Sequence, residues 1–134
     1  MAEKRVTVIG GGVAGMEAAS NLATFGISVD LIEKENTLGG HVEKWDRLFP
    51  SRRPANEITS YLADKLTELV TIHSGTEIRE IKQEDSGWQI SINGSRTILA
   101  DAILVATGFD LFEARKKEEY GYGIYDNVIT SADL

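Results

Sequence analysis

The segment Val8-Ile-Gly-Gly-Gly-Val-Ala-Gly15 decides the fold. The run Arg5–Ile9 is rich in β-branched residues and stops at these glycines, so it predicts a buried strand. Residues 13–24 carry small and apolar side chains at helical spacing, and Gly26 predicts the end of that helix. Residues 27–32 predict a second strand. Strand, helix and strand within about 28 residues indicate a βαβ unit with parallel strands.

The same segment fits the pattern Gly-x-Gly-x-x-Gly, in which each glycine has its own physical use. Gly10 permits a sharp turn off the strand, Gly12 leaves room for a diphosphate, and Gly15 lets the helix pack closely on the strand. The helix N-terminus offers unpaired N–H groups to an anion. Glu33, at the end of the second strand, can accept hydrogen bonds from both hydroxyls of an adenosine ribose. Together they predict a site for a cofactor that contains ADP.

The composition is that of one globular domain. The chain has 134 residues, of which 42% are hydrophobic and 26% charged. A net charge of −7 argues against binding to nucleic acid or to an anionic membrane surface, and no apolar run approaches the roughly 18 residues of a membrane span. There is no cysteine, which excludes disulfides, thiol catalysis and iron–sulfur ligation by cysteines of this chain. No metal site is expected, because His41 and His73 lack partners at metal-ligand spacing. A cytoplasmic setting is expected.

The middle of the chain predicts an irregular stretch followed by a second helix. Residues 34–56 contain Gly39-Gly40 and both prolines. A short helix is expected around residues 41–48, with Trp45 and Phe49 at i and i+4 facing the core. Asn56 is the expected N-cap of a longer helix. The apolar stripe of that helix is expected to consist of Ile58, Tyr61, Leu62, Leu66 and Leu69.

Beyond the second helix the pattern is that of strands. Residues 70–72 predict a third strand, and 101–106 predict a buried strand that ends at Thr107-Gly108. Between them the apolar period changes to two, with strand-like runs at 76–81, 88–92 and 96–99. The turn Asn93-Gly94 is a strong hairpin signal, because a type I′ turn needs positive φ at both central positions. We therefore expect an α/β fold: a Rossmann-like, doubly wound parallel sheet with an antiparallel β-meander.

The motif alone is compatible with FAD and NAD, and S-adenosylmethionine is bound by a related glycine loop. Two features favour FAD: the second glycine turn Leu38-Gly-Gly-His41, just after the ribose carboxylate, and the meander that leads to Ala106-Thr-Gly108. This order of motifs resembles the first domain of the flavoproteins with two dinucleotide-binding domains, the glutathione-reductase-like superfamily.

A closer resemblance is to the A subunits of heterodisulfide reductases and their flavoprotein relatives. It is carried by the glycine segment, by Ile32-Glu-Lys34 with Leu38-Gly-Gly40, and by Trp45-Asp-Arg-Leu-Phe-Pro50. Two later stretches add to it, namely Ala106-Thr-Gly-Phe-Asp110 and, most specifically, Glu119-Tyr-Gly-Tyr-Gly-Ile-Tyr-Asp-Asn-Val-Ile-Thr-Ser131. Such subunits are several times longer. Residues 1–134 are therefore expected to be one FAD-binding domain truncated at its C-terminus, with a helix beginning at residues 130–134.

The resemblance implies a flavin-dependent oxidoreductase with FAD as cofactor and iron–sulfur electron-transfer subunits as partners. It places the glycine segment at the pyrophosphate, Glu33 at the ribose, and Lys34 and the backbone of Ile78 at the adenine. The full set of expected cofactor-binding residues is Gly10, Gly12, Val13, Ala14, Gly15, Glu33, Lys34, Gly39, Gly40, His41, Ile78, Thr107 and Gly108. No residue is an evident acid, base or nucleophile, so the redox chemistry is expected to belong to the flavin.

One stretch departs from the relatives, which often carry a cysteine soon after the Phe-Pro pair. Ser51-Arg-Arg-Pro54 stands there instead, so the resemblance does not extend to a thiol or cluster role. Arg47, Arg52 and Arg53 are compatible with phosphate attraction and with ordinary surface charge. Two other functions also stay open at this stage: an NAD(H)-binding domain of a dehydrogenase, and a non-catalytic nucleotide-binding module.

Overall fold

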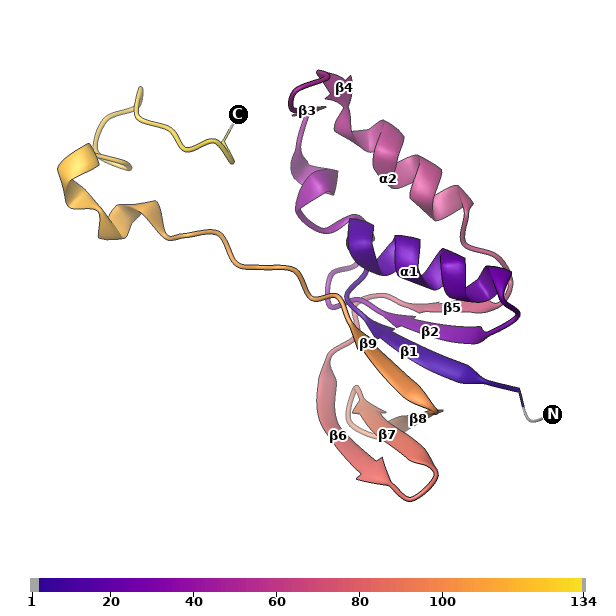
Figure 1. Ribbon diagram of the computed structural model, residues 1–134. Coiled ribbons are helices and arrows are strands. Elements are labelled where there is room, and N and C mark those ends of the chain that lie inside the picture. Colours follow the sequence, from indigo (N-terminus) through magenta and orange to yellow (C-terminus); the bar gives the residue numbers. More distant parts are fainter. Residues whose placement is uncertain (1–2, 134) are drawn as a thin grey trace.

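A computed structural model describes residues 3–133 and contains a parallel sheet, two α-helices and an antiparallel meander (Figure 1). The sheet has the strand order β5-β2-β1-β9, and all neighbouring strands are parallel. Its strands are β1 (Arg5–Ile9), β2 (Ser28–Ile32), β5 (Val70–His73) and β9 (Ala102–Val105). The order reverses at β1, because β2 and β5 lie on one side of it and β9 on the other. The expected Rossmann-like α/β fold is confirmed.

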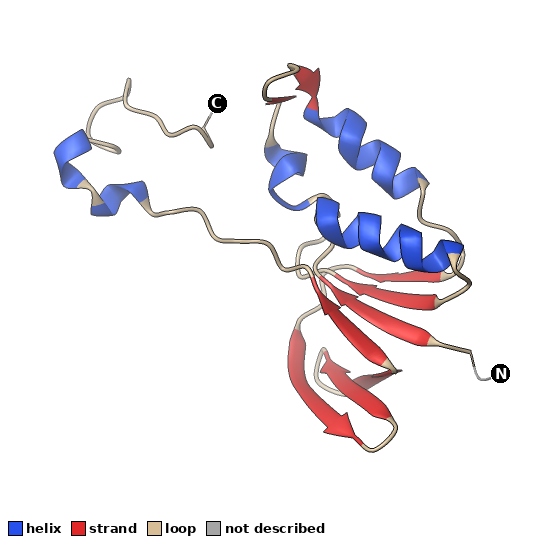
Figure 2. Ribbon diagram, in the orientation of Figure 1, coloured by secondary structure: helices blue, strands red, loops and turns tan. Residues whose placement is uncertain are grey.

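Both helices lie on one face of the sheet (Figure 2). They are α1 (Val13–Thr24) and α2 (Ala55–Asp64). Their buried side chains meet alternate residues of β1 and β2, so that Met16 and Leu62 pack in one cluster with Val8. Period-two alternation in the strands explains this arrangement, since every second side chain points toward the helices.

The meander covers the other face. It consists of β6 (Ile78–Glu84), β7 (Gly87–Ile92) and β8 (Arg96–Ala100), paired antiparallel in that order. Ile32 of the sheet is buried in a second core cluster with residues of the meander, Ile90, Ile92, Ile98 and Ala100. The hairpin turn follows the prediction, because Asn93 has φ 39° and Gly94 has φ 84°. Ile32, the last residue of β2, therefore anchors the meander directly before Glu33.

The second helix differs from its expected limits. It begins at Ala55 behind Pro54, so Asn56 lies inside the first turn and is not the N-cap. It ends at Asp64, yet Leu66 and Leu69 still pack against the core from the loop that follows. Tyr61 is 60% exposed and does not belong to the buried stripe. Apolar spacing alone could not separate a helical residue from a loop residue that packs on the same core.

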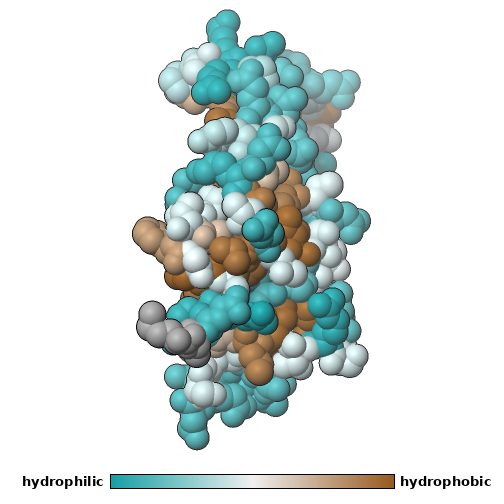
Figure 3. Space-filling view, turned by 90° about the vertical axis from the view of Figure 1, so that its right-hand side faces the viewer, coloured by the Kyte–Doolittle hydropathy of each residue, from teal (hydrophilic) through white to brown (hydrophobic). Residues whose placement is uncertain are grey.

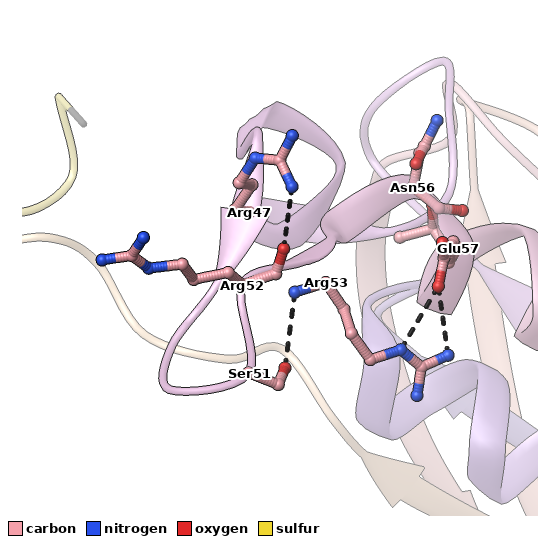
Figure 4. Close-up of polar contacts among 7 residues, drawn as sticks. Arg47, Ser51, Arg52, Arg53, Asn56 and Glu57 are labelled. Carbon is pink, nitrogen blue, oxygen red and sulfur yellow. Dashed lines mark hydrogen bonds and ion pairs between the residues drawn. The ribbon is translucent and has the colours of Figure 1, made fainter.

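The short helix expected around residues 41–48 is found over its first half, as a 3₁₀ helix, and a small hairpin follows. The 3₁₀ helix η1 (Gly40–Lys44) comes first, and β3 (Arg47–Leu48) then pairs with β4 (Arg53–Pro54). Figure 4 shows how the hairpin is held: Arg47 Nη1 donates to the carbonyl of Arg52 over 2.9 Å, and the Arg53 guanidinium pairs with Glu57. The prediction that Phe49 faces the core is wrong, because its side chain is 98% exposed.

Beyond β9 the chain runs away from the sheet as an extended arm (Figure 1). It carries two short 3₁₀ helices, η2 (Ala114–Lys116) and η3 (Glu118–Tyr120). Near its end the Asp133 carboxylate accepts the Thr130 N–H over 2.8 Å, as a capping pattern requires. Residues 131–132 form a turn and not a helix, and Leu134 lies outside the described residues.

The surface is mixed. Figure 3 shows hydrophobic side chains at the level of the sheet, with hydrophilic surface above it on the helices and below it on the meander. Within residues 3–133, no helix combines the length and the hydropathy that a membrane crossing requires.

Candidate functional site

A cavity of about 840 Å³ opens where β1, β2 and β9 end. In open α/β sheets this is the place where ligands bind, because the strand order reverses there and the loops diverge. Its volume is in the range of small-molecule sites, roughly 300–1,000 Å³. The predicted residues that line it are Gly10, Gly12, Val13, Ala14, Glu33, Lys34, Gly39, Gly40, His41, Ile78, Thr107 and Gly108. The fold therefore brings segments from four regions of the sequence to one cavity.

Gly15 is the predicted residue that does not line the cavity. It is buried, and a Cβ at this position would lie 1.7 Å from the carbonyl oxygen of Gly10. Gly10 has φ +107°, and its Cβ would lie 2.3 Å from the carbonyl oxygen of Ala106. These two glycines thus allow α1, β1 and β9 to approach one another closely.

Gly12 faces open space instead. A Cβ built on it would meet only the Cα of Gly40, at 4.0 Å, so it would project into the cavity rather than into the protein. Gly12 is also the N-cap of α1, and it offers no side chain to bond the first N–H groups of the helix. The first turn of α1 has no acidic residue. The positive end of the helix dipole is therefore directed at the cavity without a competing carboxylate from the helix itself.

The Glu33 carboxylate lies at the centre of the backbone contacts around the cavity. Its Oε2 accepts the Gly11 N–H over 2.7 Å, and its Oε1 accepts the Glu35 N–H over 2.8 Å. The residue is 7% exposed and lines the cavity. A carboxylate offers about four lone-pair positions, so two of them stay open to hydroxyl donors. Glu33 therefore orders the glycine segment and can still receive a ribose.

The second glycine turn packs against the first. The Gly39 N–H donates to the Gly11 carbonyl over 2.8 Å, and Gly12 and Gly39 form an isolated parallel β-bridge. Gly39 has φ +114° and Gly40 has φ +59°, which are left-handed conformations that favour glycine. The pair thus turns the chain back along the first loop, and this explains why Gly-Gly follows the acidic residue so closely.

Several residues at the site were not predicted, and one of them, Gly11, does not itself line the cavity. Gly11 has no room for a side chain, since its Cβ would lie 2.5 Å from Leu38 Cδ2. Trp45 is half-buried and lines the cavity, although its spacing with Phe49 suggested a core position. Glu77 and Phe109 also line it. The run Gly10-Gly11-Gly12 is the one sequence pattern that could have predicted a role for Gly11. The positions of the other residues depend on how the loops fold back over the cavity.

Charge on the cavity wall is mixed. Lys34 and Lys44 are its basic lining residues besides His41, and the acidic ones are Glu33, Glu35, Glu43, Glu77 and Asp110. Arg47, Arg52 and Arg53 do not line it. Among residues 3–133, no group of three histidine, aspartate or glutamate side chains is placed to hold a metal ion. An anion in the cavity would thus depend on the α1 N-terminus and the two lysines.

Comparison with known proteins agrees with this geometry. A family model described as pyridine nucleotide-disulphide oxidoreductase matches residues 1–124. The chain belongs to the pyridine nucleotide-disulphide oxidoreductase family. Membership of this oxidoreductase family confirms the predicted class of protein, and two solved structures agree with its fold. L-proline dehydrogenase from P. horikoshii has a TM-score of 0.71 and 26% identity, covering 81% of this chain and 24% of its own. Thioredoxin reductase from T. acidophilum has a TM-score of 0.67 and 28% identity, covering 79% and 36%.

Within the family, the resemblance to the A subunits of heterodisulfide reductases is confirmed. In Methanosarcina acetivorans, the A subunit of the ferredoxin/F(420)H(2)-dependent CoB-CoM heterodisulfide reductase is 25% identical to this chain over 219 residues. The match covers 99% of this chain and 27% of that relative. Because this chain has 134 residues, the relative holds additional residues inside the matched span. The chain thus spans about a quarter of its relative's length and lacks part of what lies within that quarter.

Proposed function

We propose that this chain binds FAD and forms the FAD-binding part of an electron-transferring oxidoreductase. The observation that carries the proposal is the open position at Gly12, which is the N-cap of α1 and offers no side chain to the first N–H groups of the helix. Beside it, the Gly11 N–H donates to the carboxylate of Glu33, 22 positions further along the chain. A diphosphate there would receive N–H groups of Val13 and Ala14, and the Glu33 carboxylate would accept the ribose hydroxyls. The residues present therefore fit an ADP-containing cofactor.

The remaining lining residues have roles that follow from their place. Lys34 is next to Glu33 and would lie along the adenine, with the backbone of Ile78 beside it. Gly40 and His41 would border the phosphates and the ribityl chain, while Thr107 and Gly108 would close the opposite side. FAD, when bound, supplies the hydride and single-electron chemistry. This chain binds it, orients it and excludes water from its phosphates.

The absence of cysteine constrains how electrons leave. Disulfide reduction by a protein thiol requires a cysteine, and this chain has none. Electrons would therefore leave the cofactor without passing through a thiol of residues 1–134. The relatives are subunits of a larger enzyme by name, which supports the proposal that this chain works with partner subunits. We further propose that these partners are iron–sulfur electron-transfer subunits and that the assembly is cytoplasmic. On this proposal, residues 1–134 correspond to the first part of a longer FAD domain.

Titration of the purified protein tests the cofactor. We expect FAD to bind more weakly than in the longer relatives, so flavin absorbance should appear in the protein peak when the gel-filtration buffer contains FAD. At 100 times its dissociation constant, FAD should raise the free energy of unfolding by about 2.7 kcal/mol. Saturation with NADH and no response to FAD would replace the proposal with an NAD(H)-binding domain. A folded protein that responds to neither would replace it with a module that does not bind dinucleotides.

A further inference from the structure

His41 joins the two walls of the cavity across its opening. Its Nε2 lies 2.9 Å from the carbonyl oxygen of Phe109, a residue 68 positions away in the sequence. The two rings also pack, with centroids 5.4 Å apart and an interplanar angle of 39°. Both residues line the cavity, His41 from η1 and Phe109 from the segment that follows β9. This pair is therefore a side-chain bridge between the second glycine turn and the strand-end segment.

The bridge is the main attachment of that segment. The last backbone bond of the β9 region to β1 is from the Ala106 N–H to the Ile9 carbonyl, over 2.8 Å. In the part of the chain that the structure describes, residues 107–112 make one hydrogen bond, the bond to His41. Phe109 is 65% exposed, so burial contributes little to its position. The path of the chain past the cavity thus depends on His41.

The chemistry of the contact defines the proton on His41. A carbonyl oxygen only accepts, so Nε2 must carry the hydrogen, and a neutral ring is then unprotonated at Nδ1. The imidazolium also carries a hydrogen on Nε2. The bond is thus compatible with both charge states, and a glutamine, whose Nε2 extends a similar distance, can replace the donor.

We propose that His41 is a positioning residue that holds residues 107–109 across the cavity and slows the release of the cofactor. This inference rests on the proposed function for the identity of the ligand. The contact itself does not touch a reacting atom. On this proposal the contact closes over bound cofactor, so its loss is expected to raise the dissociation rate, while the association rate stays unchanged or rises. One exposed neutral hydrogen bond corresponds to about a two- to tenfold change in that rate.

Rapid-mixing measurements of FAD binding test the kinetic part. His41→Ala should raise the FAD dissociation rate about two- to tenfold and leave the association rate unchanged or higher. His41→Gln should restore most of the wild-type rate. Phe112→Ala is the matched control, since Phe112 is an aromatic residue of the same arm with 66% exposure and, among the described residues, no ring packing on His41. Equal dissociation rates for wild type and His41→Ala would overturn the proposal.

A spin label tests the contact without any cofactor. The chain lacks cysteine, so Leu111→Cys allows one nitroxide to be attached at a single position. His41→Ala should sharpen its spectrum, which reports greater mobility, and His41→Gln should not. An unchanged spectrum would refute the bridge whether or not FAD binds. Sharpening in a protein that fails to bind FAD would reject the proposed function and keep the bridge.

Discussion

The two walls of the cavity are held in different ways. The glycine wall (residues 10–15 with Glu33 and Gly39-Gly40) is tied by two backbone bonds, Gly10 N–H to the Ile32 carbonyl and Gly39 N–H to the Gly11 carbonyl. A third bond runs from the Gly11 N–H to the buried Glu33 carboxylate. The strand-end wall (residues 107–110) is exposed and bonded through His41 alone in the described chain. One wall therefore has its shape before any ligand arrives. The other depends on a single side-chain contact.

The largest effect is expected from a methyl group inside the glycine wall. Gly15→Ala places a Cβ 1.7 Å from the Gly10 carbonyl, so the backbone of α1 or β1 must move. We expect the free energy of unfolding to fall by about 3 kcal/mol or more, as measured by urea denaturation. The matched control is Gly12→Ala, whose Cβ has no neighbour closer than 4.0 Å. Equal stabilities of the two variants would mean that the wall is not close-packed.

A side chain placed in the open space at Gly12 should abolish FAD binding and leave the stability of the apo protein unchanged. Gly12→Val fills the space reserved for the diphosphate, and its side chain meets the cavity rather than the protein. The stabilisation of about 2.7 kcal/mol by excess FAD should therefore disappear. The apo protein should unfold near the wild-type temperature in the same thermal-shift experiment. A full FAD response in this variant would contradict the assignment of the diphosphate.

Glu33→Gln separates the two uses of the carboxylate. Glutamine keeps one acceptor oxygen, so the N–H of Gly11 or of Glu35 would face an NH₂ group and lose its partner. We expect the apo protein to lose about 1–3 kcal/mol, with weaker FAD binding as well. Glu35→Gln is the control, because that side chain is exposed and should change stability by less than about 0.5 kcal/mol. If Glu33→Gln kept wild-type stability but bound FAD weakly, the carboxylate would serve the ligand and not the glycine wall.

The smallest change in stability is expected at the start of β9, the strand that leads into the strand-end wall. The Arg5 N–H donates to the Asp101 carboxylate over 2.8 Å and Lys4 adds a second contact, which together hold the pKa of Asp101 below its usual range. A lowered folded-state pKa stabilises the protein above the unfolded pKa, and that contribution is lost as the pH falls through the folded value.

Stability curves of wild type and Asp101→Asn test this attachment. The wild type should be slightly more stable at neutral pH, and the difference should shrink below about pH 4. A difference that stays constant across this range would show that the carboxylate is not what ties β9 to β1 at this end. In that case the start of β9, like the strand-end wall that follows it, would be held without a stabilising carboxylate contact.

Local sequence signals located the elements whose geometry is local. Residues 13–24 form the helix as expected, and Asn93-Gly94 adopts the positive φ pair that its turn type needs. The stretch from Trp45 to Pro54 was misjudged, because an i, i+4 spacing has meaning only if the backbone is helical. There it forms a hairpin that exposes Phe49 and leaves Trp45 on the cavity wall. Nothing in the residues themselves distinguishes these outcomes.

The sequence by itself determined the glycine wall, because its turns require residues without a Cβ and because Glu33 directly follows the second strand. The opposite wall was decided by tertiary structure. Thr107, Gly108 and Phe109 reach the cavity because β9 pairs with β1 across about a hundred residues, and no local preference encodes that pairing. His41 meets Phe109 only after both segments have been brought there, since long-range contacts depend on the packing of the sheet as a whole.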